Sequence, residues 1–130
     1  MPASIAEVLE RARRRLVRVE ADEAAAELAR GALLVDIRSA AQRADQGEIP
    51  GAIAIDRTML EWRLDPTSPS RLEQAKDHQV RVIVVCAEGY SSSLAAASLQ
   101  DIGLANATDV IGGFEAWNAA GLPVRHQRGH

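Results

Sequence analysis

The chain has 130 residues, of which 47% are hydrophobic and 25% charged, a composition typical of one globular domain with its own core. Its formal net charge of −3 gives no electrostatic reason to expect a nucleic-acid partner. No segment near Met1 resembles a signal peptide, and no apolar stretch approaches the roughly 20 residues that a membrane span needs. Cys86 is the single cysteine, which excludes an intramolecular disulfide. We therefore expect a cytoplasmic protein without membrane or nucleic-acid partners.

Residues 1–20 are predicted to form an N-terminal helical extension. Ser4 and Glu7 have the spacing of a capping box, and the apolar residues that follow suggest one helical stripe: Ile5, Val8, Leu9 and Leu16. We interpret the basic run at 11–15 as a solvated helix face, with a docking patch as the alternative. The extension could pack on the domain or mediate self-association.

Short apolar runs alternate with helical patterns through the rest of the chain. We expect strands at 33–37, 52–55, 80–85 and 108–111. Helices are expected at 22–30, at about 71–78, from Ser92 or Ser93 to about 103, and around Phe114 and Trp117. A turn is predicted at 49–51 and a loop at 65–70. This order predicts an α/β fold with a mainly parallel sheet and helices on both faces.

Cys86 lies where the strongest predicted strand ends and a helix begins a few residues later. Ligands of parallel α/β sheets bind at this strand end, and the N–H groups of a helix start favour an anion. Residues 87–91 are small enough to curl so that their N–H groups converge. Such a site can lower the pKa of a thiol from about 8.5 to about 3.5–7.5. The alternative is an inert buried cysteine.

Other chemistries find less support around this cysteine. The three histidines have no metal-ligand spacing to it: His78, His126 and His130. We therefore expect no metal. The segment at 89–93 lacks the second glycine of a serine-hydrolase elbow, so Ser91, Ser92 and Ser93 are predicted to be helix caps.

Four segments, taken together, resemble the motifs of the rhodanese family of sulfurtransferases. They are LLVDIR (33–38), GEIPGAIAI (47–55), VIVVCAEGYSSS (82–93) and GGFEAWNAAGLPV (112–124). The resemblance implies a five-stranded, mainly parallel sheet in a three-layer sandwich, with the domain at 21–125 and a polar tail at 126–130.

The resemblance also implies covalent sulfur transfer without a cofactor. Cys86 would take the outer sulfur of a small donor such as thiosulfate, hold it as a persulfide and pass it to a thiol, cyanide or protein acceptor. The loop residues would bind the negative sulfur: Ala87, Glu88, Gly89, Tyr90, Ser91 and Ser92.

This sequence departs from the family pattern at several positions, and these departures bear on which sulfur donor it can bind. Ser91 stands where many members have arginine, Glu48 where they often have histidine, and Gln42-Arg43 replaces an acidic-aromatic pair. Arg57 and Arg63 are candidates for substrate contact, with surface arginines on a short helix as the alternative. Asp36 and Arg38 are interpreted as structural support. The large aromatic residues are expected in the core: Trp62, Phe114 and Trp117.

Two other functions stay open at this stage. The chain could be a non-catalytic persulfide carrier or a sulfide-binding or docking module, since the loop lacks arginine. A cysteine phosphatase or arsenate reductase of related architecture would need a loop one residue longer and an arginine to clamp the oxyanion.

Overall fold

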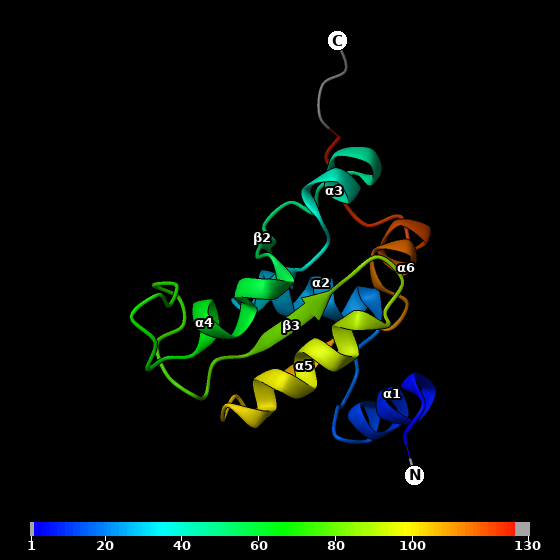
Figure 1. Ribbon diagram of the computed structural model, residues 1–130. Coiled ribbons are helices and arrows are strands. Elements are labelled where there is room, and N and C mark those ends of the chain that lie inside the picture. Colours follow the sequence, from blue (N-terminus) through cyan, green and yellow to red (C-terminus); the bar gives the residue numbers. More distant parts are fainter. Residues whose placement is uncertain (1, 127–130) are drawn as a thin grey trace.

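The computed structural model describes residues 2–126, which form a parallel sheet covered by helices on both faces (Figure 1). The strands are β1 (Leu33–Asp36), β2 (Ile53–Ala54), β3 (Val82–Val85) and β4 (Ala107–Asp109). Their order is β2-β1-β3-β4, and every neighbouring pair is parallel. β3 lies in the interior of the sheet and is buried throughout, as its uninterrupted β-branched sequence predicts. The predicted α/β class is confirmed.

Two apolar layers hold the helices to the sheet. α4 (Leu60–Leu64) and α5 (Ser91–Asp101) pack on one face, around Val84 and Leu99. α2 (Ala21–Ala29) and α6 (Gly113–Ala119) pack on the other, around Ile83 and Trp117. The remaining helices are α1 (Ile5–Arg14), α3 (Ala40–Gln46) and the 3₁₀ turn η1 (Arg57–Met59).

The sheet has four strands where the resemblance implied five. A single parallel bridge between Val19 and Val110 takes the fifth place, beside β4. The Val19 N–H donates to the Asp109 carbonyl, and the Ile111 N–H donates to that of Val19. Glu20 then caps α2, so the chain turns into a helix before a strand can continue.

The extension at 1–20 packs its helix α1 along α5 (Figure 1). The predicted capping box of Ser4 and Glu7 is present. Only the later part of the apolar stripe is buried: Leu16 is 8% exposed, whereas Ile5 is 71% exposed. Arg15 adds an exposed ion pair of 2.6 Å with Asp101.

Two local predictions are wrong, and one helix was not predicted. Residues 71–78 form turns instead of a helix, because Leu72 bonds back to the Arg63 carbonyl and few apolar side chains follow it. Trp62 is 58% exposed and does not join the core, in contrast to Phe114 and Trp117, which are buried as predicted. α3 was not expected, although Ser39 and Gln42 form its capping box.

The turn at 49–51 is confirmed by a hydrogen bond from the Ala52 N–H to the Ile49 carbonyl and by a positive φ at Gly51. Residues 127–130 of the predicted tail lie outside the described residues. Of the helices within 2–126, none has the length and apolar character that crossing a membrane requires.

Candidate active site

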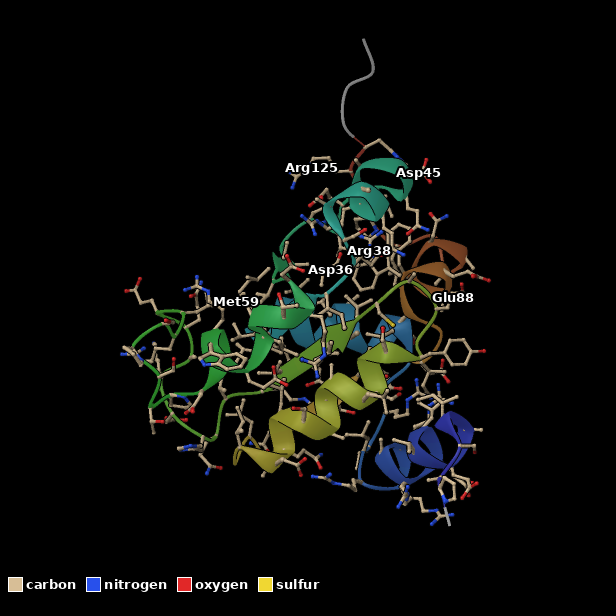
Figure 2. The ribbon with its side chains drawn as sticks, viewed as in Figure 1. Asp36, Arg38, Asp45, Met59, Glu88 and Arg125 are labelled. Atoms are coloured by element: carbon tan, nitrogen blue, oxygen red, sulfur yellow. The ribbon has the colours of Figure 1, made fainter. Side chains whose placement is uncertain are left out.

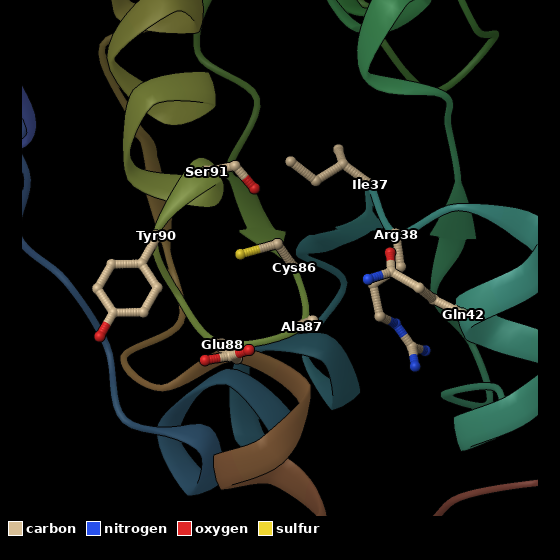
Figure 3. A pocket seen from close by; sticks show the side chains of 8 residues that line it. All are labelled: Ile37, Arg38, Gln42, Cys86, Ala87, Glu88, Tyr90 and Ser91. Atoms are coloured by element: carbon tan, nitrogen blue, oxygen red, sulfur yellow. The ribbon is translucent and has the colours of Figure 1, made fainter. Parts of the chain in front are cut away.

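Cys86 follows the last residue of β3 and lies at the carboxyl edge of the sheet. Val85 pairs with Asp36, so the end of β1 stops level with it and brings residues 37 and 38 beside the cysteine. These residues line a cavity of about 210 Å³ together with Gln42, Cys86 and the loop (Figure 3). The Cys86 residue is 5% exposed, so the thiol is nearly buried but opens into this cavity.

Main-chain N–H groups bind the sulfur. The Gly89 N–H donates to Cys86 Sγ at 3.2 Å, and the Ser92 N–H, in the first turn of α5, donates at 3.3 Å. Burial raises the pKa of the thiol, but hydrogen bonding from Ser92, Ser91 and Gly89 outweighs it. The pKa of Cys86 therefore lies below that of an ordinary thiol, which favours the thiolate.

The start of α6 holds the loop from outside. The Phe114 N–H donates to the Cys86 carbonyl at 2.7 Å, and the Glu115 N–H donates to the Ala87 carbonyl at 3.0 Å. This approach requires glycine at 113, where φ is +60° and a Cβ atom would lie 2.4 Å from the Cys86 carbonyl oxygen. With these carbonyls turned outward, the N–H groups of the same trans peptides face the opposite way.

The serines after the loop do not cap α5 as predicted. Tyr90 is the N-cap residue and makes no side-chain capping bond. The Ser92 and Ser93 hydroxyls instead donate to Asp109 Oδ2, at 2.7 and 2.8 Å. A carboxylate only accepts, so the hydroxyl hydrogen of Ser92 points to Asp109, and the Ser92 main-chain N–H remains for the sulfur. Ser91 lines the cavity.

Asp36 and Arg38, both labelled in Figure 2, form a buried ion pair beside the cavity. Arg38 Nη2 lies 2.7 Å from Asp36 Oδ2 and also donates to the Gly47 carbonyl at 2.8 Å. Its guanidinium stacks on the Phe114 ring at 3.9 Å, which links β1 to α6.

Arg57 and Arg63 make their described contacts elsewhere. Arg57 pairs with Glu61 at 2.9 Å, and Arg63 donates to the Ser70 carbonyl at 2.7 Å. Neither is among the residues that line the cavity. Glu48 pairs with Arg43 at 3.0 Å. Contact of Arg57 or Arg63 with a donor stays a prediction.

The cavity mouth is not electropositive. Glu88 is exposed and lines it, while Arg38, the cation among the described lining residues, is neutralised by Asp36. A neighbouring hollow of about 300 Å³ shares Gln42, Ala87 and Glu88 and adds Glu115. Within residues 2–126, no cluster of three or more His, Cys, Asp and Glu side chains could hold a metal ion.

Two arginines missed by the sequence reasoning reach the loop from the N-terminal extension. Arg13 donates to the Gly89 carbonyl at 2.8 Å, and Arg18 donates to it at 3.1 Å. The interpretation of the basic run as a solvated face is therefore wrong for Arg13. Its position in the run carried no signal that distinguished it from Arg14, which pairs with Glu10 on the surface.

The chain is similar to known proteins over most of its length. The family model of the rhodanese-like domain matches residues 20–120. Thiosulfate sulfurtransferase GlpE of Actinobacillus succinogenes is 37% identical over 93 residues, covering 72% of this chain and 75% of that protein. The protein of the same name from Pseudomonas entomophila is 35% identical over 102 residues, covering 78% and 84%.

Two solved structures extend the comparison. A Rhodopseudomonas palustris protein of unknown function, described as a possible tyrosine phosphatase, superposes with a TM-score of 0.85 at 32% identity and covers 96% of each chain. The thiosulfate sulfurtransferase of Pseudomonas aeruginosa has a TM-score of 0.72 at 29% identity, with 93% of this chain and 22% of that chain covered.

Proposed function

Because this chain belongs to the rhodanese-like domain family, we propose that it is a sulfurtransferase whose nucleophile is Cys86. The observation that carries the proposal is the pair of main-chain N–H groups on Cys86 Sγ, at 3.2 and 3.3 Å, in a thiol that opens into a cavity. A lowered pKa provides the thiolate that attack on sulfur needs.

The reaction has two displacements. The Cys86 thiolate attacks the outer sulfur of thiosulfate, the bond between the two donor sulfurs breaks with its electron pair, and sulfite leaves. The product is a Cys86 persulfide anion. An acceptor such as cyanide or a thiolate then attacks its outer sulfur, and the thiolate of Cys86 is restored. No cofactor, electron or net proton is required.

The loop residues 87–92 supply the electrostatic support. Charge stays on sulfur in both the free and the loaded enzyme, so N–H groups fixed before the reaction stabilise both states without reorganisation. The cavity of about 210 Å³ suits a small donor. Because the chemistry needs a reduced thiol, the proposal places the protein in a reducing compartment such as the cytoplasm.

Incubation with thiosulfate and cyanide is the direct test. The wild-type protein should form thiocyanate, and Cys86→Ser should reduce the rate to background, since a serine hydroxyl is not ionised at neutral pH and forms no persulfide. A thermal unfolding profile like that of the wild type would show that the variant folds. Undiminished turnover by the variant would contradict the assignment.

The charge at the cavity favours one second candidate, a persulfide carrier that loads slowly from an anionic donor and holds the sulfur for a protein acceptor. Arg38 is paired with Asp36, and Glu88 repels an anionic donor. Intact-mass measurement after exposure to thiosulfate separates the two functions. A stable gain of one sulfur atom with negligible thiocyanate would indicate a carrier, whereas no gain at all would indicate a docking or binding module.

The description of the Rhodopseudomonas palustris protein as a possible tyrosine phosphatase adds a further control. Residues 87–92 contain no arginine to clamp a phosphoryl group. We therefore expect no hydrolysis of an aryl phosphate by the wild type above the level of Cys86→Ser.

A further inference from the structure

The Gly89 carbonyl accepts hydrogen bonds from two guanidinium groups of the N-terminal segment. Arg13 Nη2 lies 2.8 Å from it and Arg18 Nη2 lies 3.1 Å from it. Both arginines precede residue 20, where the family match begins. The contact therefore joins the catalytic loop to a part of the chain that the family pattern does not include.

The same two arginines reach the other side of the loop. Arg18 binds both carboxylate oxygens of Asp109, at 2.9 and 3.1 Å, and Asp109 in turn accepts from the Ser92 and Ser93 hydroxyls. Arg13 Nε donates to Ser93 Oγ at 3.1 Å. Gly89 and Ser92, whose N–H groups bind the sulfur, are thus both tied to this network.

We propose that Arg13 and Arg18 are positioning residues for sulfur transfer, which take over from outside the loop the support that a loop arginine would give. Resting on the proposed function, this inference assigns them two effects. They hold the Gly89 carbonyl outward, so the Tyr90 N–H of the same trans peptide faces the loop interior. Arg18 also neutralises Asp109, which is fully buried.

The second effect acts directly on the thiolate. Asp109 Oδ2 lies 2.7 Å from the hydroxyl of Ser92, whose N–H binds Cys86 Sγ. Without Arg18, a buried carboxylate at this place would oppose a second negative charge on the sulfur. With Arg18, the two carboxylate oxygens are matched by a guanidinium fork.

Simple attachment of α1 does not require these bonds. Arg15, the residue after α1, forms a separate ion pair of 2.6 Å with Asp101 of α5, and the side chains of Ala12 and Leu16 are buried. Arg13 and Arg18 are the described residues of the extension that bond to the loop at 87–92. The chain therefore offers a control, Arg15→Gln, that removes one arginine contact of the N-terminal extension with α5 without touching the loop.

The test measures the pKa of Cys86 from the pH dependence of its alkylation by iodoacetamide, which reports one site because the chain has one cysteine. The other charged groups around the thiol are unchanged in every variant: Asp36 and Arg38 after β1, Glu88 in the loop and Glu115 on α6. No sulfur donor is present, so the result does not depend on sulfurtransferase activity.

We expect Arg13→Gln and Arg18→Gln each to raise the Cys86 pKa by about one unit, which lowers the alkylation rate about tenfold well below that pKa. Arg13→Lys, which keeps a cation near the Gly89 carbonyl, should recover part of the shift. Arg15→Gln should leave the pKa unchanged. The double variant Arg18→Gln with Asp109→Asn removes both charges, so its Cys86 pKa should return towards the wild-type value, and Arg13→Gln carries the test if Arg18→Gln does not fold.

A Cys86 pKa equal to that of the wild type in Arg13→Gln, and in Arg18→Gln where that variant folds, would overturn the inference. An equal shift in Arg15→Gln would also overturn it, because docking of α1 would then be the whole effect. A shifted pKa in a protein that makes no thiocyanate would keep the positioning role and reject the proposed function, so the two failures are distinguishable.

Discussion

The Cys86 loop is held on two sides, and the two sides use different groups. On the α6 side, main-chain N–H groups of Phe114 and Glu115 bind the loop carbonyls of residues 86 and 87. On the N-terminal side, guanidinium groups of Arg13 and Arg18 bind the carbonyl of residue 89. The first side lies within the family match at 20–120, and the second lies before it.

The difference separates what the fold requires from what this chain adds. Main-chain donors are present whatever the side chain, so the α6 contact depends on close approach and therefore on glycine at 113. Side-chain donors disappear with one substitution, and they bring charge as well as hydrogen bonds. The α6 side should therefore govern loop geometry and stability, while the arginine side should govern the ionisation of the thiol.

The largest effect is expected where the α6 side is anchored. Arg38→Met removes the guanidinium that stacks on Phe114 and leaves Asp36 as a buried, uncompensated charge. We expect a loss of about 3–5 kcal/mol in the free energy of unfolding, measured by urea denaturation.

Arg57→Met is the matched control, since its ion pair with Glu61 is 42% exposed on the arginine side and should contribute less than about 1 kcal/mol. An equal loss in both variants would show that Arg38 does not anchor the loop. The thiosulfate KM of Arg57→Met and Arg63→Met also tests the predicted donor contact of these two arginines.

A smaller loss is expected from Gly113→Ala. The new Cβ would lie 2.4 Å from the Cys86 carbonyl oxygen at a φ of +60°, so strain and loop displacement should together cost at least about 2 kcal/mol. Gly121→Ala is the comparison, because its φ is +72° but no atom lies within 4 Å of the added methyl group.

That control should lose only about 1 kcal/mol, the cost of the backbone conformation alone. Urea denaturation gives both values. Equal losses in the free energy of unfolding would mean that the close approach of α6 to the loop does not make Gly113→Ala more destabilising than Gly121→Ala.

The smallest effect is a shift in pH dependence. The pKa of Cys86 is lowered by hydrogen bonding to Ser92, Ser91 and Gly89 against the effect of burial. Sulfur transfer should therefore persist as the pH falls below the ordinary thiol value of about 8.5, and decline only as the pH passes the lowered pKa.

The free energy of unfolding should also depend on pH because the pKa of Cys86 is lowered in the folded protein. The folded protein loses the thiol proton at lower pH than the unfolded chain does. The stability of the wild type relative to Cys86→Ser should therefore rise with pH between the two pKa values and level off above the ordinary one. A thiolate titration with its midpoint at the ordinary value would contradict this.

Local patterns were sufficient for the sheet and for the position of the cysteine. The run Val82–Val85 is uniformly β-branched, which predicts a strand buried on both faces, and the glycine and small residues after Cys86 predict a tight loop before a helix. Such signals come from neighbours in sequence. They also predicted that Glu88 faces solvent, since the main chain fills the inside of the loop.

Contacts between distant segments were beyond this reasoning. Trp62 is large and apolar, but it lies on the short helix α4 with more than half of its surface exposed. Ser92 and Ser93 have the composition of helix caps, yet Asp109, from the end of β4, takes their hydroxyl groups. Arg13 lies 76 residues from its acceptor, and only the docking of α1 selects it from the neighbouring arginines.

The Gly89 carbonyl, which accepts from both Arg13 and Arg18, bears on where the boundary of this domain should be drawn. A fragment that begins at the first residue of the family match would keep Cys86, the loop and α6. It would lose the guanidinium groups of Arg13 and Arg18, and the buried carboxylate of Asp109 would lose its ion pair. The bounds of the family match therefore do not include every residue that supports the loop. A graft of this loop onto another scaffold should include the N-terminal segment that carries Arg13 and Arg18.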